Sequence, residues 1–334
     1  MQDLPQKFIE EVENFITRLT PDKHLLYIIQ PCSIGDFLYT GGLAHAVQAK
    51  KKKSATVLVV KERMKNLGIT YPNFAGIIFL PKDTINSVMN YCKLTANYEG
   101  DNWIYGHFHV PYGKIGGGYM WDSNLHLIGR YKKDVFNIPL DTPFMKPIVP
   151  QISEENIAAL NEKYVLDKDK TIIIMPYVHS TKQLDIKFWE VLAQILNEKN
   201  YIVYTNVDGF SEKPIKGTKP ITSTFPELSY IADKVKCFIG SRNGIFDFLA
   251  LTNAKTININ PYPDWMYEIG VLFPNANNRT FYNAMDYMSP ILKSLPQDEV
   301  NIEIRLHHRH IRDKDVCYSY EDILNGILAE VNKN

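Results

Sequence analysis

The sequence predicts an α/β fold with two domains that face each other across a cleft. In both halves of the chain, short strands rich in Ile, Val and Leu alternate with helical patterns, as in parallel sheets covered by helices on both faces. A length of 334 residues exceeds what one hydrophobic core usually supports. Four prolines between positions 139 and 150 mark a linker, which gives domains at 1–147 and 148–334. Because open parallel sheets bind ligands beyond the carboxyl ends of their strands, we expect the ligand between the domains.

The first domain begins with an amphipathic helix. Its apolar positions and the acidic residues among them indicate a helix and not a signal peptide; these positions are Phe8, Val12, Phe15, Ile16 and Leu19. A strand at 24–31, a helix over 32–53 and a strand at 55–61 form a β-α-β unit. A helix-like stretch at 62–69 precedes a strand at 77–80. Between residues 97 and 150 the periodicity predicts no regular element.

The second domain repeats this alternation after the linker. Strands are predicted at 171–177, 201–207, 236–240 and 255–261, and helices at 185–200, at 226–235 and from residue 244. A last helical pattern occupies 320–331. This last helix belongs to the second domain, or it packs back across the linker onto the first domain.

The charge balance excludes some classes of function. Because 37 basic residues balance 37 acidic ones, a broad nucleic-acid surface is not expected. No apolar run approaches the roughly 20 residues of a membrane span, so we expect a cytoplasmic protein. The basic clusters at 50–53 and 305–312 are most simply solvated. Peripheral contact with the inner face of a membrane, or with an anionic substrate, is the alternative for them.

Neither a metal site nor a cofactor is expected. Four cysteines are scattered without a C-x-x-C pair, so buried thiols are predicted instead of a zinc site or disulfides; they are Cys32, Cys92, Cys237 and Cys317. A G-x-G-x-x-G sequence after a strand is also missing, which disfavours a dinucleotide-dependent oxidoreductase.

Gly35 and Asp36 stand at the start of the early helix of the first domain. The glycine allows the chain to turn sharply, and the helix N-terminus favours the ionised carboxylate. Asp36 therefore has two explanations. It caps the helix, or it is a general base that faces the cleft.

Two stretches of the second domain are suited to bind an anion. A lysine in the loop after the strand at 171–177 can reach a phosphate, and an arginine stands beside a helix start whose unpaired N–H groups suit a diphosphate. The residues concerned are Ser180, Thr181, Lys182, Arg242, Asn243 and Gly244. Taken together they predict a phosphate-bearing ligand, although most lysines in such loops are only solvated.

Taken in order, three stretches resemble glycosyltransferase family 9, whose heptosyltransferase-like members have two Rossmann-like domains in the GT-B architecture. They are IGDFLYTGGLAHAV from residue 34, STKQLDIKFWEVLAQIL from residue 180 and FPELSYIADKVKCFIGSRNGIFDFLALTNAKTININP from residue 225. With the matching order of elements, this resemblance covers most of the chain outside residues 97–150.

The resemblance implies an inverting, metal-independent transfer of a sugar from a nucleotide-sugar donor to a hydroxyl of a glycan or cell-envelope acceptor. Asp36 would remove the acceptor proton, and Lys182 would balance the charge that grows on the departing diphosphate. The second domain would hold the donor, which is a substrate, so no cofactor is implied. The acceptor side in the first domain would include Gly35, Thr40, His107 and His109.

One segment departs from the family's pattern of Asp-(Ser/Thr)-Gly followed three residues later by His. This chain instead has Arg242, Asn243, Gly244 and then Asp247. Arg242 would strengthen anion binding, whereas Asp247 would repel a diphosphate unless it faces a sugar or ribose hydroxyl. The alternative for Asp247 is a structural role, in which its carboxylate is stabilised by the dipole at the start of a helix. The identity of the donor is left unassigned.

Thr224 and Glu227 also have two explanations. They lie in a loop near which members of the family bind the nucleoside, so donor contacts are one of them. Threonine followed three residues later by glutamate is also the pattern of a capping box, and we favour capping.

Two other functions stay open, because a fold does not fix a function. A nucleotide-sugar epimerase of similar architecture would isomerise its substrate without an acceptor. A protein that binds a nucleotide or glycan without catalysis would explain the altered segment at 242–247.

Overall fold

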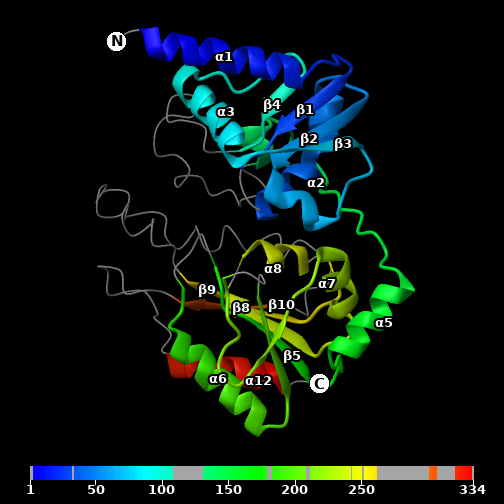
Figure 1. Ribbon diagram of the computed structural model, residues 1–334, viewed down its shortest axis with the longest axis vertical. Coiled ribbons are helices and arrows are strands. Elements are labelled where there is room, and N and C mark those ends of the chain that lie inside the picture. Colours follow the sequence, from blue (N-terminus) through cyan, green and yellow to red (C-terminus); the bar gives the residue numbers. More distant parts are fainter. Residues whose placement is uncertain are drawn as a thin grey trace. The chain divides into compact units, whose positions relative to one another are not determined.

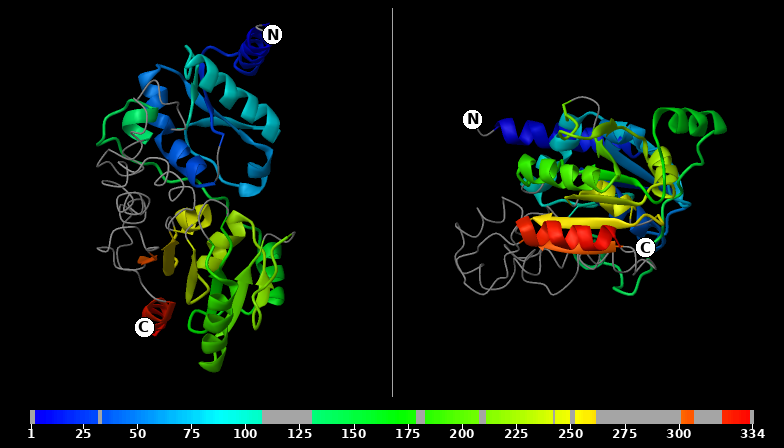
Figure 2. Two further views of the ribbon diagram at one scale, coloured as in Figure 1. Left: turned by 90° about the vertical axis from the view of Figure 1, so that its left-hand side faces the viewer. Right: turned by 90° about the horizontal axis from the view of Figure 1, so that it is seen from below.

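The chain forms two compact units that are divided in sequence between Val149 and Pro150. The structure is a computed structural model that describes residues 3–31, 34–107, 131–178, 183–207, 211–241, 243–249, 252–261, 301–306 and 320–332. Each unit consists of a parallel β-sheet with helices on both faces (Figures 1 and 2). The predicted α/β class is therefore confirmed.

The first unit is built on a parallel sheet in the order β3-β2-β1-β4. Its strands are β1 (Leu25–Ile29), β2 (Ala55–Lys61), β3 (Phe74–Leu80) and β4 (Trp103–Tyr105). Tyr27 of the central strand β1 lies opposite Val57 on one side and Trp103 on the other. The first three strands confirm the prediction, whereas β4 lies in the stretch for which no element was predicted.

Helices cover both faces of this sheet. They are α1 (Asp3–Leu19), α2 (Ile34–Lys50), the 3₁₀ helix η1 (Glu62–Leu67), α3 (Lys82–Thr95) and the π-helical turn η2 (Tyr131–Val135). Val12 and Ile16 of α1 pack with Val88 of α3 against Tyr27 and Ile29, which point to one face of β1. Because side chains alternate along a strand, the β1 residues on either side of Tyr27 and Ile29 in sequence face the layer formed by α2.

The two glycines in the middle of α2 form a packing seam. A Cβ atom at Gly41 would overlap the ring of Tyr71, and one at Gly42 would overlap the ring of Phe144. The amide of Met145 also donates to the carbonyl of Gly42 at 2.9 Å. Part of the proline-rich stretch therefore packs on the first unit instead of forming a free linker.

The second unit contains a parallel sheet in the order β10-β9-β8-β5-β6-β7. Its strands are β5 (Thr171–Met175), β6 (Ile202–Asn206), β7 (Lys219–Ile221), β8 (Cys237–Ser241), β9 (Thr256–Pro261) and β10 (Asn301–Leu306). The four predicted strands are present. The strands β7 and β10 add one member at each edge.

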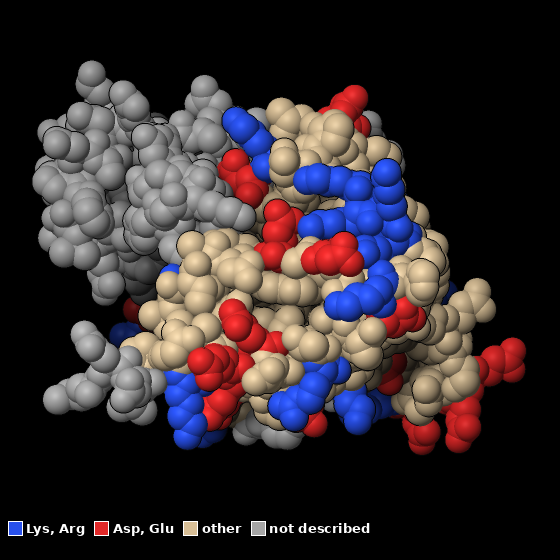
Figure 3. Space-filling model, turned by 90° about the horizontal axis from the view of Figure 1, so that it is seen from above, with Lys and Arg blue, Asp and Glu red and all other residues tan. Residues whose placement is uncertain are grey.

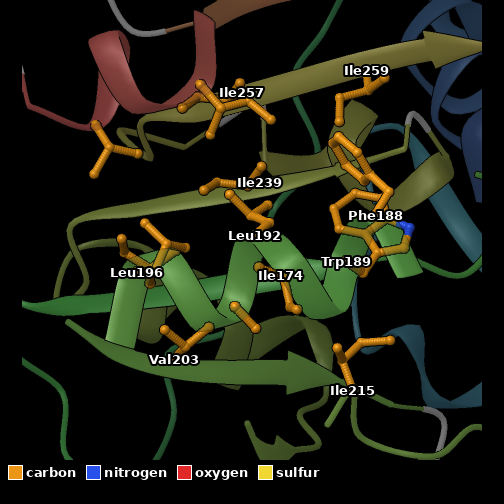
Figure 4. Packing of buried hydrophobic residues seen from close by; sticks show 14 of the residues in the cluster. Ile174, Phe188, Trp189, Leu192, Leu196, Val203, Ile215, Ile239, Ile257 and Ile259 are labelled. Atoms are coloured by element: carbon orange, nitrogen blue, oxygen red, sulfur yellow. The ribbon is translucent and has the colours of Figure 1, made fainter. Parts of the chain in front are cut away.

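The helices of the second unit also form two layers. They are α5 (Glu154–Lys163), α6 (Ile186–Glu198), α7 (Phe225–Ala232), α8 (Gly244–Leu249) and α12 (Tyr320–Val331). Trp189 of α6 lies in a core that includes Ile174 of β5 and Ile239 of β8 (Figure 4). Ile327 and Val331 of α12 join the same core. The apolar face of α12 thus packs within the second unit.

The basic cluster at residues 50–53 is used within the fold. The Lys50 ammonium donates to the carbonyls of Phe136 and Asn137, at 3.0 and 2.9 Å. Lys51 pairs with Glu99 at 2.8 Å, and Lys53 pairs with Asp101 at 3.2 Å. Figure 3 shows basic side chains grouped with acidic ones among them on one face of the molecule. These lysines therefore tie loops together. Of the other basic cluster, at 305–312, the described residues include only Arg305 and Leu306, at the end of β10 (Asn301–Leu306).

Two of the cysteines are buried free thiols, as predicted. Burial raises the pKa of Cys92 and of Cys237 to about 12, so both stay protonated near neutral pH. Cys32 and Cys317 lie outside the described residues. Within the described part of the chain, no helix is both long and apolar enough to cross a membrane.

Candidate functional site

The carboxyl edge of the first sheet brings together Asp36, His107 and Tyr131. Asp36 lies in the first turn of α2, which follows β1, and His107 follows β4, the neighbour of β1 in the sheet. The Tyr131 hydroxyl donates to Asp36 Oδ1 at 2.7 Å. Nε2 of His107 lies 3.4 Å from the same oxygen, which makes an ion pair when the imidazole is protonated. Asp36 and His107, which the sequence assigned to one site, are therefore in contact.

The three side chains differ in their access to solvent. The Asp36 side chain is 17% exposed, whereas that of His107 is 3% exposed. Tyr131 is fully buried. A carboxylate that is held by buried partners but still reaches solvent has the arrangement that a general base requires.

Gly106 and Thr40 set the position of His107. The Gly106 amide donates to the carbonyl of Ile29 at 2.8 Å, and the Thr40 hydroxyl donates to the carbonyl of Gly106 at 3.2 Å. A Cβ atom at position 106 would lie 2.8 Å from Cγ2 of Ile28. Only glycine therefore lets the end of β4 run this close to β1. Thr40, predicted on the acceptor side, anchors the backbone beside His107.

Replacing Gly106 with valine is expected to lower the free energy of unfolding of the first unit by about 1–3 kcal/mol, because the added side chain overpacks the contact with Ile28. The displaced backbone should also separate His107 from Asp36. Urea unfolding followed by circular dichroism measures the change. Gly76→Ala in β3 is the matched control, since a Cβ atom there meets nothing within 4 Å. Equal stability of the two variants would contradict this packing.

Two other residues predicted on the acceptor side have different outcomes. Gly35 is buried in the first turn of α2, next to Asp36. His109 lies outside the described residues. Of the predicted acceptor-side residues, His107 contacts the Asp36 carboxylate, Thr40 bonds to the backbone beside His107, and Gly35 precedes Asp36 in the chain.

In the second unit, the side chain of Asn243 joins two loops at the carboxyl edge of the sheet. Its Oδ1 accepts from the amides of Ile245 and Phe246 at 2.9 and 3.4 Å, and its Nδ2 donates to the carbonyl of Tyr177 at 3.2 Å. Asn243 therefore caps α8 and ties it to the loop after β5. Two of the amides at the start of α8 are thus bound within the chain.

The other predicted donor residues that the structure describes have capping or buried positions. Thr224 and Glu227 form a capping box, with the Thr224 amide donating to Glu227 Oε2 at 2.7 Å and the Glu227 amide donating to Thr224 Oγ1 at 3.4 Å. The capping explanation that we favoured is confirmed. Asp247 is 2% exposed in the first turn of α8, where the helix dipole favours its carboxylate.

The remaining residues of the predicted donor site, Ser180, Thr181, Lys182 and Arg242, lie outside the described residues. A hydrogen bond joins the described residues on either side of Ser180, Thr181 and Lys182, since Gln183 Nε2 donates to the carbonyl of Val178 at 2.9 Å. Among the residues that the structure describes, no three His, Cys, Asp or Glu side chains gather as ligands for a metal.

Tyr131 is the residue of the site that the sequence did not reveal. It is separated from Asp36 by 95 positions, and it lies in a stretch without periodicity. No local spacing links the two residues, so only the tertiary structure shows their contact.

Comparisons with known proteins support the fold. Neither protein-family models nor curated proteins match the chain. Among solved structures, a family 9 glycosyl transferase from Veillonella parvula DSM 2008 is similar, with 11% identity, a TM-score of 0.54 and coverage of 92% of this chain and 96% of that chain. The ADP-heptose lps heptosyltransferase II of E. coli has 14% identity and a TM-score of 0.54, with coverage of 92% and 98%. The chain therefore has the fold of these two glycosyltransferases.

Proposed function

We propose that the protein is a glycosyltransferase that transfers a sugar from a nucleotide-sugar donor to a hydroxyl of an acceptor. The observation that supports this most is the partly exposed Asp36 carboxylate, held by Tyr131 and His107 at the carboxyl edge of a parallel sheet. Ligands of open α/β folds bind at this edge. A solved structure of the same fold is described as an ADP-heptose heptosyltransferase, which supports a nucleotide sugar as the donor class.

The proposed reaction is a single displacement that inverts the anomeric carbon. The acceptor hydroxyl gives its proton to the Asp36 carboxylate while its oxygen forms a bond to the anomeric carbon. The bond from that carbon to the diphosphate oxygen breaks, and the nucleoside diphosphate leaves with the electron pair. General-base assistance of this kind contributes about two to four powers of ten in rate.

On the donor side, we assign charge compensation to the second unit. Lys182 and Arg242 would balance the negative charge that grows on the departing diphosphate. Asn243, which follows β8, donates to the carbonyl of Tyr177, which follows β5. Asp247 would accept a hydrogen bond from a sugar or ribose hydroxyl. In this scheme the leaving group needs no metal.

For the acceptor, we propose a glycan or another cell-envelope component. The E. coli structure of the same fold is described as an lps heptosyltransferase, which supports this class. Such an acceptor would place the protein at the inner face of the membrane as a peripheral partner. No nucleic acid is proposed as a ligand, because the formal net charge of the chain is zero.

Mass spectrometry together with proton NMR of the reaction products tests this function, because NMR reports the anomeric configuration and reveals an isomerised sugar of unchanged mass. The purified protein is incubated with ADP-, GDP-, UDP- and CMP-sugars and a cell-envelope fraction, with EDTA or with magnesium. Transfer predicts a free nucleotide and a glycosylated acceptor of inverted configuration in EDTA. An isomerised sugar nucleotide without an acceptor product would identify an epimerase. Binding without any turnover would identify a non-catalytic binding protein.

A further inference from the structure

We propose that Tyr131 is a positioning residue that keeps the Asp36 carboxylate ionised and aligned for proton transfer. This inference rests on the proposed function, in which Asp36 is the base. The Tyr131 hydroxyl donates to Asp36 Oδ1 at 2.7 Å, the distance of a strong hydrogen bond to a carboxylate. Asp36 and Tyr131 come from different elements, α2 and η2, so tertiary folding places them together.

Neighbouring rings hold the Tyr131 side chain in one orientation. Its ring stacks on Tyr39 of α2, with centroids 5.4 Å apart and an interplanar angle of 18°. The centroid of the Phe136 ring lies 6.1 Å from that of Tyr131, and the His107 ring meets the Tyr131 ring edge-on with centroids 6.4 Å apart. Because Tyr131 is fully buried, its hydroxyl must find a partner inside the protein. The phenol therefore presents its O–H group to Asp36 in a fixed direction.

The backbone that carries Tyr131 is also fixed. The Phe136 amide donates to the Tyr131 carbonyl at 2.9 Å, which closes the π-helical turn, and the Ile138 amide donates to the Lys132 carbonyl at 2.8 Å. The Lys132 ammonium donates to the carbonyl of Leu140 at 2.7 Å. Single π-helical turns are rare and occur frequently at functional sites. Here the turn directs the phenol toward α2.

This contact has a consequence for the chemistry of Asp36. A hydrogen bond donated to a carboxylate favours its ionised form, which is the form that accepts a proton. Among the described residues, the groups that face the carboxylate include Tyr131 from η2 and His107 from the end of β4. Removal of the Tyr131 hydroxyl should therefore keep Asp36 protonated up to a higher pH.

The test compares Tyr131→Phe with the wild type, since phenylalanine keeps the ring stack and loses only the hydroxyl. The acidic limb of the kcat/KM profile is expected to move up by about one to two pH units, with the KM for the donor unchanged. Tyr91→Phe is the matched control, because its buried phenol contacts Glu13 and Asn97 away from the site. An unchanged profile in Tyr131→Phe would overturn the assignment.

A second measurement separates this inference from the proposed function. Carbon-13 NMR of labelled aspartate follows the titration midpoint of Asp36 without any turnover. An upward shift in Tyr131→Phe is expected, and a smaller shift in the same direction is expected for Phe136→Leu, which loosens the ring. If both variants show these shifts but the wild type turns over no sugar nucleotide, the glycosyltransferase function is rejected and the role of Tyr131 is retained. An unchanged midpoint in both variants would reject the role of Tyr131.

Discussion

Replacing Asp36 with asparagine is expected to lower kcat by about two to four powers of ten, because the amide cannot accept the acceptor's proton. The amide oxygen can still accept the hydrogen bond from Tyr131, so the shape of the site is retained. Donor binding, which we assign to the second unit, should stay unchanged. Release of nucleoside diphosphate measures turnover, and isothermal titration calorimetry measures donor affinity.

The control for this variant is Asp83→Asn. Asp83 also lies in the first turn of a helix in the same unit, so both substitutions remove a favourable charge near a helix N-terminus. In each, the loss of that interaction with the helix dipole should cost about 0.3–1 kcal/mol of stability. Turnover should fall in Asp36→Asn alone. Full activity of Asp36→Asn would exclude Asp36 as the base.

Replacing Trp189 with alanine is expected to lower the free energy of unfolding of the second unit by about 3–5 kcal/mol. Trp189 is one of the largest fully buried side chains, and its ring meets Phe188 edge-on at 5.1 Å. It lies in the α6 layer over the sheet, where its loss leaves a cavity that the surrounding isoleucines cannot fill (Figure 4). Urea unfolding followed by far-ultraviolet circular dichroism measures the loss.

Val191→Ala on the same helix is the matched control. Val191 is 44% exposed, so truncation of its side chain should change the free energy of unfolding by about 0.5 kcal/mol or less. Both variants shorten a side chain on α6, and only Trp189 faces the core. A loss in Trp189→Ala no larger than that in Val191→Ala would show that this face of α6 is assigned incorrectly.

Most of the fold could be predicted because its central strands carry a strong local signal. The apolar runs that became β1, β2, β5 and β8 are buried on both faces, so most residues in them are hydrophobic. The three-residue strands β4 and β7 are too short to show a period. The strand β10 contains Glu303 and Arg305, and these charged residues interrupt the apolar run that would otherwise predict a strand.

The candidate site was only partly accessible from the sequence. Asp36 could be found because a local pattern, Gly-Asp at a helix start, points to it. The capping box of Thr224 and Glu227 is local as well, and the favoured interpretation is confirmed. In contrast, the contact between Tyr131 and Asp36 depends on where the irregular stretch returns to the sheet. No spacing within the sequence contains that information.

Thermal unfolding with nucleotides is the measurement that most directly tests whether the protein takes a nucleotide-sugar donor. UDP, GDP, ADP and CMP are compared with their sugar conjugates, each in EDTA and with magnesium. A ligand at about 100 times its dissociation constant should add roughly 2.7 kcal/mol of stability. We predict selective stabilisation in EDTA by one nucleotide and its sugar conjugate. The absence of a shift with every member of the panel would contradict the proposed donor site.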